Sequence, residues 1–367
     1  YLDRGYLNFE ILSTNVSISP NKKRLQISID ISEGEKYKFS KISISGELDE
    51  FDVDELKKQV VAKENELFSS RKVTETTTEL GNYLGNFGYA FANINPISDI
   101  NEEDKTVSYD FFVSTGGKVY VRNINFIGNS RTKDEVLRRE MRQFESSWYN
   151  ESKVARSKFR LTRLQYFSAV DVDTAQVPGL TDQVDLNVSV TERNTGRVML
   201  GAGVSSAEGL MGSFNVKQAN FAGTGNTVAL GVSTGSINRT YSLSYTDPYY
   251  TDDGVSRGFT VYRRDRNTAK LRGIGTYNTY SYGGGVNFGI PLSETDFLNF
   301  GVTLDFTELD LTDRSPALYK DYCNKALNEG SCNADALEFN VGIKTDTRDN
   351  VLVPTEGMLT MYNATLT

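Results

Sequence analysis

Few residues in this chain could do covalent chemistry. Its 367 residues include no histidine, which excludes Ser-His-Asp triads and metal sites built on imidazole. Residues 231–235 read Gly-Val-Ser-Thr-Gly, the pattern of a nucleophile elbow, which needs a strand, a sharp turn, a helix and a histidine partner. The sequence around Ser233 instead alternates as a strand that runs into a loop. We therefore expect no catalytic residue and no enzymatic activity.

The two cysteines of the chain, Cys323 and Cys332, are separated by eight residues of a polar stretch. This spacing does not fit a four-ligand zinc site. Asp171 and Asp173 lack the remaining ligands of a calcium loop, and no helix start follows the glycine run 283–285, as a phosphate cradle would require. The sequence therefore predicts no metal site and no cofactor, and it leaves the cysteines as a candidate disulfide.

A charged stripe is the third candidate. Residues 134–145 have helical periodicity, and Arg138, Arg142 and Glu145 follow one another at i, i+4 and i+7. The expected buried stripe of this helix is Leu137, Met141 and Phe144. Guanidinium groups are suited to bidentate pairing with carboxylates of a partner. From the residues alone, this stripe is either a docking surface or an ordinary solvated face.

The secondary-structure pattern of the sequence that must position these residues changes near residue 194. Between residues 184 and 190, valine and leucine alternate with polar residues, which predicts a strand with one buried face. After residue 194 the alternation resumes, with apolar residues at 198, 200, 202 and 204. Helical and strand patterns alternate upstream of this point, whereas one strand follows another downstream of it. We expect no helix in the downstream half.

The upstream half contains a repeat with an offset of 82 residues. Residues 32–46 recur as residues 114–128, with Ser, Gly, Lys, Ile and a final Gly in matching positions. Self-similarity at a fixed offset indicates a repeated structural unit. Each unit reads strand–helix–helix–strand–strand, and its first helix begins with acidic residues that suit the helix dipole. Residues 1–33 read as the tail of a further copy, because Gly5-Tyr6 echoes Gly88-Tyr89.

The downstream half predicts about nine strands of the length that crosses a bilayer at a tilt. Short turns alternate with longer polar loops, of which residues 312–335 form the longest. This asymmetry is typical of outer-membrane barrels. A soluble β-sandwich is the alternative, although its strands are usually shorter and its loops less one-sided.

The composition is compatible with the membrane interpretation. A net charge of −8 and a pI near 5.0 argue against a nucleic-acid surface, which needs clustered lysine and arginine. The chain has no run of 18 apolar residues, so we expect no transmembrane helix. The mean hydropathy of −0.42 does not oppose membrane strands, since every second residue of such a strand is polar. We expect the chain to be an internal segment of a longer protein, because it begins within a motif.

Several of these features together resemble the BamA family of POTRA-plus-barrel proteins, the central subunits of the bacterial β-barrel assembly machinery. They are the two Gly-Tyr pairs, residues 120–129, the helical run 136–143, and residues 192–196 at the entry to the barrel. Residues 220–225 and 246–250 are similar to early barrel turns of that family. The resemblance covers essentially the whole chain, and its specificity lies in the order and spacing of the motifs.

The resemblance implies a domain organisation. Residues 1–33 would be the end of a third POTRA domain, residues 36–115 the fourth and residues 118–193 the fifth, each with an α+β fold in the order β-α-α-β-β. Residues 194–367 would be the N-terminal portion of an antiparallel transmembrane β-barrel, about nine of roughly sixteen strands.

It also implies a function and partners. Members of the family assemble and insert β-barrel proteins into the bacterial outer membrane, with their POTRA domains in the periplasm. The implied partners are a BamD-like lipoprotein and other assembly lipoproteins, unfolded outer-membrane protein clients and outer-membrane lipid, without nucleic acid. The alternative within the superfamily is a sister translocase, either TamA-like or a two-partner secretion pore. Outside it, the alternative is a passive porin with periplasmic domains.

Finally, the resemblance gives roles to two candidate sites. It implies that the Arg138, Arg142 and Glu145 stripe docks the lipoprotein. It also implies that the first barrel strand is a seam that pairs with client strands, comprising Arg197, Val198, Met199, Leu200, Gly201, Ala202, Gly203 and Val204. We expect residues 201–203 to occupy positions where later strands place leucine, tyrosine or phenylalanine. Pairing at the seam would then be weak, because glycine lowers strand propensity and adds no side-chain packing.

Overall fold

The computed structural model describes residues 1–48, 51–206, 208–268, 277–325, 331–349 and 353–367. Its contacts divide the chain into two compact units. The first unit comprises residues 1–125, 141–158 and 171–189, and the second comprises residues 126–140, 159–170 and 190–367.

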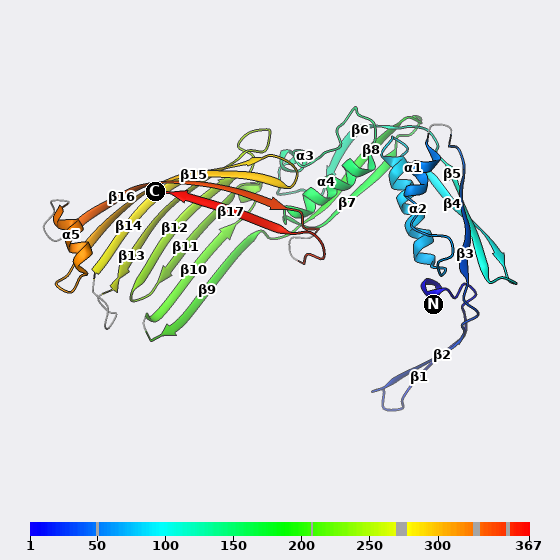
Figure 1. Cartoon of the computed structure of the whole chain (residues 1–367), viewed down its shortest axis with the longest axis horizontal. Helices are drawn as coiled ribbons and strands as arrows, with labels where there is room; N and C mark the ends of the chain where they lie inside the picture. Colours follow the sequence, from blue (N-terminus) through cyan, green and yellow to red (C-terminus); the bar gives the residue numbers. More distant parts are fainter. Residues whose placement is uncertain (49–50, 207, 269–276, 326–330, 350–352) are drawn as a thin grey trace. The chain divides into compact units, whose positions relative to one another are not determined.

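The upstream half has the predicted order of strands and helices (Figure 1). It begins with η1 (Leu2–Arg4), β1 (Glu10–Ile18) and β2 (Leu25–Ser32), and the two strands form an antiparallel pair. The next repeat consists of β3 (Lys38–Gly46), α1 (Val53–Lys58), α2 (Ser70–Gly85), β4 (Asn93–Asn101) and β5 (Thr106–Ser114). The last consists of β6 (Tyr120–Ile127), α3 (Asp134–Arg138), α4 (Glu151–Arg163), β7 (Phe167–Gln176) and β8 (Gln183–Glu192). Their sheets have the equivalent orders β3-β5-β4 and β6-β8-β7, which confirms the β-α-α-β-β fold.

The glycine that ends the first strand of each repeat is required by the backbone. Gly46 has φ +108° and Gly128 has φ +92°, a left-handed region that side chains other than glycine rarely adopt. A Cβ on Gly46 would collide with the carbonyl oxygen of Val113, and one on Gly128 would collide with that of Val190. In both repeats the glycine therefore lets the first strand lie close to the last strand of the same repeat. This explains why each of the two copies of the sequence repeat ends in glycine.

The downstream half forms a nine-stranded antiparallel sheet among the residues that the structure places (Figure 1). Its strands are β9 (Gly196–Ser205), β10 (Gly209–Gln218), β11 (Thr227–Thr234), β12 (Asn238–Asp247), β13 (Ser256–Asn267), β14 (Tyr277–Pro291), β15 (Asp296–Leu311), β16 (Ser331–Asp346) and β17 (Leu359–Leu366). Each strand pairs with its neighbours in sequence, and β9 and β17 lie at the two edges. The predicted nine strands are thus confirmed. None of the helices described here has the length and apolar content of a membrane span.

The two faces of this sheet differ in chemistry because strand residues alternate between them. Residues directly opposite each other on paired strands share a face, so the register connects residues in rows across the sheet. One row is Val198, Val216, Leu230, Leu243, Val261, Gly284, Leu304 and Leu337. The adjacent row on the other face is Arg197, Lys217, Ala229, Ser244, Thr260, Gly285, Thr303 and Glu338. We call these faces apolar and inner, and the apolar face is suited to lipid.

Three details of the downstream half differ from the sequence prediction. Helix α5 (Ala317–Lys325) lies where no helix was expected, and the short helix η2 (Phe221–Gly223) precedes β11. Residues 312–335 are polar, and this polarity predicts a loop. The Ser315-Pro316 pair immediately before α5 is nevertheless a helix-start signal. Strand β16 also begins earlier than expected, so that Cys332 lies opposite Leu309 of β15.

The repeats are joined by a recurring contact. In the first joint, the Tyr37 amide donates to the carbonyl oxygen of Gly5 over 2.8 Å. The ammonium group of Lys36 lies 5.3 Å from the centre of the Tyr6 ring, within the range of a cation–π interaction. The Gly-Tyr pair of one repeat therefore holds the start of the next repeat from two sides.

The second joint has the same chemistry. The Val119 amide donates to the carbonyl oxygen of Gly88 over 2.9 Å, and the Lys118 ammonium group lies 5.3 Å from the centre of the Tyr89 ring. The Gly-Tyr pairs that marked the repeat in the sequence are thus the contacts between repeats.

A polar side chain completes each joint at the second helix of the following repeat. Asp3 accepts a hydrogen bond of 2.8 Å from the Arg71 amide at the start of α2. In the second joint, the side-chain oxygen of Asn86 accepts one of 2.8 Å from the Ser152 amide at the start of α4. The side chain of Asn150 also donates to the Asn86 carbonyl over 2.9 Å. These contacts satisfy helix N-terminal amides that have no partner within the helix.

We predict that Asn86→Ala loosens the second joint. The variant loses the acceptor for the Ser152 amide, and one hydrogen bond contributes about 1 kcal/mol. Exchange of that amide in the intact protein should therefore accelerate about fivefold in hydrogen-exchange mass spectrometry. Asn95→Ala on the exposed part of β4 is the matched control. Equal exchange at Ser152 in the two variants would show that Asn86 does not hold the joint.

Candidate functional site

Strand β9 contains all the residues predicted for the seam, and it lies at an edge of the nine-stranded sheet. Just before the strand, the Ala219 amide donates to the Thr195 carbonyl over 3.3 Å. In an antiparallel pair the hydrogen-bonding direction alternates with every residue. The backbone groups of odd-numbered β9 residues therefore point to β10. Those of even-numbered residues, including Val198 and Leu200, point to the open edge.

The small residues of β9 divide between the two faces, contrary to our expectation. Ala202 shares the apolar face with Leu200, whereas Gly201 and Gly203 lie opposite Ser213 and Met211 on the inner face. The prediction overlooked that adjacent strand residues point to opposite faces. A Cβ on Gly201 would lie 2.5 Å from the Ser213 hydroxyl oxygen. The lack of side-chain packing at the seam is therefore a property mainly of its inner face.

The predicted docking stripe does not form a single helical face. Helix α3 ends at Arg138 rather than at residue 145, so Arg142 and Glu145 do not continue its spacing. The Arg138 side chain donates to Asp134 over 3.0 Å and lies 5.1 Å from the centre of the Phe126 ring. The first residue of the predicted stripe is thus engaged with its own helix and with β6.

The chain after α3 is held by side chains of other elements. The Arg142 amide donates to the Ser157 hydroxyl of α4 over 2.8 Å, and Glu145 accepts a hydrogen bond of 2.8 Å from the Ile124 amide. Gln143 is fully buried, whereas Phe144, expected in the core, is 62% exposed. We call residues 141–148 the α3–α4 loop. In it, the amides of Arg142 and Gln143 bond to Ser157 of α4 and that of Ser146 bonds to the Val121 carbonyl of β6, so these amides do not continue the helix.

A sequence signal for this loop existed. In the preceding repeat, the Thr76 hydroxyl of α2 accepts hydrogen bonds from the Val61 and Ala62 amides. Thr76 and Ser157 are the equivalent hydroxyl residues of the two second helices. A hydroxyl residue repeated inside a helix is otherwise unexplained, since serine and threonine are weak helix formers.

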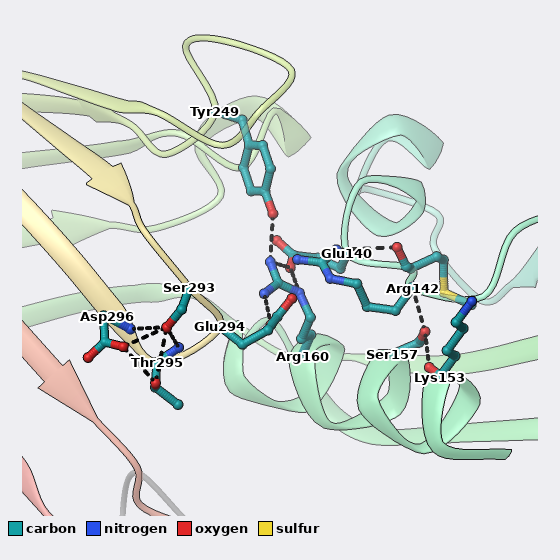
Figure 2. A network of polar contacts seen from close by, with 11 residues as sticks. Glu140, Arg142, Lys153, Ser157, Arg160, Tyr249, Ser293, Glu294, Thr295 and Asp296 are labelled. Atoms are coloured by element: carbon teal, nitrogen blue, oxygen red, sulfur yellow. Dashed lines mark hydrogen bonds and ion pairs between the residues drawn. The ribbon is translucent and has the colours of Figure 1, made fainter. Parts of the chain in front are cut away.

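Arg160 of α4 is a site residue that the sequence reasoning missed. Figure 2 shows its guanidinium group between Glu140 and the turns that precede β13 and β15. It lies 2.7 Å from Glu140 and 2.8 Å from Glu294, and it donates to the Tyr249 hydroxyl over 2.8 Å. The Glu140 side chain is only 5% exposed. Burial, and then the nearby Glu140 carboxylate, raise the pKa of Tyr249 above its ordinary value.

A second arginine of α4 binds the last residue of strand β16. Arg163 lies 2.9 Å from Asp346, whose side chain is 2% exposed and which also pairs with Arg348 over 2.9 Å. One carboxylate shared by two guanidinium groups satisfies more of its lone pairs than a single partner would. Arg160 and Arg163, one helical turn apart, thus connect the end of α4 to two turns between strands and to the end of β16.

Glu192 organises the end of β8, just before the barrel. Its carboxylate accepts hydrogen bonds from the Thr132 amide over 2.7 Å, the Arg131 amide over 3.0 Å and the Ser130 hydroxyl over 3.0 Å. Burial opposes its ionisation, but these hydrogen bonds outweigh burial and lower the pKa of Glu192 to about 2. The carboxylate therefore fixes the segment that leads into α3.

The remaining candidates lie away from the seam. Ser233 is in β11, which is followed by β12 and not by a helix, so its surroundings lack the geometry of a nucleophile elbow. Cys323 of α5 and Cys332 of β16 form a disulfide with a Cα–Cα distance of 5.1 Å. They pack with Leu309 and cover one end of β15 and β16.

Comparison with known proteins connects these features. Residues 220–367 match the Omp85 superfamily domain, and residues 37–116 and 119–193 match the POTRA surface antigen variable number repeat. The chain is 37% identical to outer membrane protein assembly factor BamA of Neisseria meningitidis, over 99% of this chain and 46% of that protein. The BamA of Nitratidesulfovibrio vulgaris is 29% identical over 98% of this chain and 44% of that protein.

A solved structure supports the fold directly. The crystal structure of BamA from Haemophilus ducreyi lacking POTRA domains 1–3 has a TM-score of 0.73 and 29% identity to this chain. The similarity covers 90% of this chain and 63% of that one. The chain spans about half the length of the curated relatives it matches.

We predict a pH-dependent contribution of Glu192 to stability. Because folding lowers its pKa from 4.5 to about 2, the contribution is complete above about pH 4.5 and is lost as the pH falls toward 2. The shift corresponds to roughly 3 kcal/mol. Glu192→Gln should therefore lower the urea midpoint at pH 7, as reported by the fluorescence of Trp148, the single tryptophan of the chain.

The difference in urea midpoint between Glu192→Gln and the unsubstituted chain should become smaller as the pH is lowered from 4.5. Glu102→Gln, at an exposed residue of the β4–β5 turn, is the control and should leave the midpoint unchanged. A difference that persists undiminished at pH 3 would contradict the assignment to the ionised carboxylate.

Proposed function

The chain belongs to the Omp85 superfamily, with POTRA repeats preceding the barrel strands, and from this membership we propose that it assembles and inserts β-barrel proteins in the bacterial outer membrane. Two of the relatives reported above are named outer membrane protein assembly factors. The observation that supports the proposal is the position of β9 at the edge of the sheet that the described residues form, where its even-numbered backbone groups point away from β10. Binding to this edge requires neither ATP nor covalent chemistry.

The edge can act as a template because of its surroundings. An unpaired backbone amide or carbonyl costs several kcal/mol in hydrocarbon. A client strand that pairs with β9 satisfies its own backbone groups and those of β9 together. The unpaired groups of an incoming strand are therefore satisfied at the place where that strand enters the membrane, which lowers the barrier to insertion.

Release requires that the pairing is not too strong. Gly201 and Gly203 offer backbone donors and acceptors but no side chain on the inner face, and Ala202 offers one methyl group on the apolar face. Cross-strand side-chain pairs contribute about 0.2–1 kcal/mol each, so this part of β9 holds a partner chiefly by hydrogen bonds. A client strand can thus be bound and later exchanged.

We further propose that the α3–α4 loop docks an assembly lipoprotein of the BamD type. Phe144 and Trp148 of this loop are 62% and 60% exposed, and Arg142 and Glu145 supply charge beside them. Exposed aromatic residues with arginine are typical of the anchor residues of protein interfaces. In this proposal the docking surface is the α3–α4 loop and not the helical stripe that the sequence predicted. Arg138 lies on α3, outside this loop, and its role in docking is addressed by a variant of its own.

We predict that Val198→Pro slows client insertion. Proline removes the amide donor that Val198 presents to the open edge, and the loss of about 1 kcal/mol lowers occupancy of the paired state about fivefold. Insertion of a labelled client barrel into liposomes containing the intact protein measures the effect. Val198→Ala keeps the amide and should insert clients at the normal rate. Normal insertion by Val198→Pro would remove the support for templating at β9.

We also predict that Phe144→Ala releases the lipoprotein without unfolding the repeat. The side chain is mostly exposed, so its truncation leaves no cavity and should change the melting temperature little. Copurification of lipoproteins from outer membranes measures docking. Phe112→Ala, at an exposed phenylalanine of β5, is the control and should retain the partner. Release by Arg138→Glu but not by Phe144→Ala would place the docking surface on α3.

A further inference from the structure

Arg257 is a cation on the apolar face of the sheet. It precedes Val261 of the apolar row by four residues of β13, and residues an even number apart in a strand share a face. A charge at the centre of the hydrocarbon is costly, so a cation on a face suited to lipid belongs close to the membrane surface. Arg257 fits this expectation, because β13 begins at Ser256 and the arginine is therefore at the end of the strand.

This end of the sheet is the end at which the repeats join it in the sequence. Strand β9 begins there, directly after β8, and antiparallel pairing through β10, β11 and β12 brings the start of β13 to the same end. POTRA repeats of outer-membrane assembly factors lie in the periplasm. Arg257 is therefore expected at the periplasmic leaflet of the membrane.

Two aromatic rings hold the guanidinium group of Arg257. Its carbon Cζ lies 3.7 Å from the centre of the Tyr250 ring and 5.0 Å from that of the Phe259 ring, both within the range of cation–π interactions. Tyr250 belongs to the turn between β12 and β13, in which its amide donates to the Val255 carbonyl over 2.9 Å. The rings orient the cation before a ligand arrives, which reduces the entropy that binding would cost.

No carboxylate neutralises Arg257 in the described part of the chain. Its side chain is in no ion pair there, and its Nε atom is buried without a hydrogen-bond partner. Asp247 lies directly opposite it in the register, but that carboxylate accepts a hydrogen bond of 3.0 Å from the Tyr249 amide. Asp247 also lines a cleft with Asp252 and Arg139. The half-buried guanidinium group can therefore take an anion from outside the protein.

The surroundings of Arg257 have the chemistry of a membrane surface. Phe288 and Phe300 lie in the same row across the sheet, and the centres of their rings are 5.1 Å apart. Tyr250 is 47% exposed. Aromatic residues gather at the depth of the lipid headgroups, where phospholipids carry their phosphate. The planar fork of a guanidinium group matches a phosphate, which it can bind through two parallel hydrogen bonds.

We propose that Arg257 binds the phosphate of a phospholipid in the periplasmic leaflet, beside the turn between β12 and β13. The inference goes beyond the insertion of client barrels and does not depend on pairing at β9. The adjacent Tyr249 of this turn accepts a hydrogen bond from Arg160 of α4. The turn is then held by α4 through one tyrosine, while the arginine that stacks on the next tyrosine holds it at the depth of the headgroups.

The test compares two photoreactive lipids with the intact protein in a non-ionic detergent. Phosphatidylglycerol and diacylglycerol carry the same diazirine-labelled acyl chain and differ in the phosphate headgroup. Mass spectrometry of peptides measures crosslinking to residues 250–259. Phosphatidylglycerol should crosslink there at least about tenfold more than diacylglycerol, since only the former offers a charged acceptor. Arg257→Gln should bring this ratio close to one.

The matched control is Arg264→Gln, which should preserve the ratio. Arg264 is also in β13 and lies 4.2 Å from the centre of a tyrosine ring, that of Tyr262, but it points to the inner face because its number is even. Crosslinking to residues 298–306 of β15, on the same lipid face, should be equal in all three proteins and reports that the variants keep the fold of the sheet.

Three outcomes would overturn the proposal. The first is equal crosslinking of the two lipids to residues 250–259 of the unsubstituted protein, which would make the site a general acyl-chain contact. The second is an undiminished ratio in Arg257→Gln with normal crosslinking at β15. The third is loss of the ratio when glycerol 3-phosphate is added at the concentration of the lipid, which would assign the site to a soluble phosphate ester.

Discussion

Unpaired backbone groups are the constraint on which this structure depends. In hydrocarbon each such group costs several kcal/mol, and the ordered pairing of β9 through β17 satisfies them between neighbouring strands. The same constraint applies to the outer edge of β9, where the even-numbered backbone groups have no strand partner among the residues that the structure describes. In the function proposed above, these groups bind an incoming strand. The rows of apolar and polar residues fix which face of an added strand meets lipid and which faces inward.

In the proposed function, the edge of β9 can bind a strand in a defined position only if the elements that precede β9 in the sequence are held in place. Buried charged side chains hold them. Arg160 joins Glu140 to the turns before β13 and β15, and Glu192 ties the end of β8 to the start of α3. Removing one partner of a buried ion pair leaves an uncompensated charge, at a cost of about 3–5 kcal/mol.

The sequence predicted those features that depend on local patterns. The 82-residue repeat, the β-α-α-β-β order and the nine strands follow from periodicity and from glycines such as Gly46 and Gly128, whose backbone conformation and close contacts exclude other residues. It failed where a distant side chain decides the local structure. Ser157 takes the amide of Arg142 and ends the helix that periodicity extended to residue 145. The pairing of Arg160 with Glu294 could not be foreseen, because 134 residues separate them and neither lies in a recognisable motif.

The joints between repeats have an evolutionary consequence. Both use a carbonyl of a Gly-Tyr pair, a lysine over the tyrosine ring and an Asp or Asn oxygen at a helix start. Every repeat that has these residues at its start and at its end can form the same joint with every other such repeat. Duplication of one repeat by recombination therefore creates a junction that is already complementary. The number of repeats can change between lineages without the simultaneous appearance of a new interface. Modularity of this kind lets the array lengthen or shorten while the barrel and its edge remain unaltered.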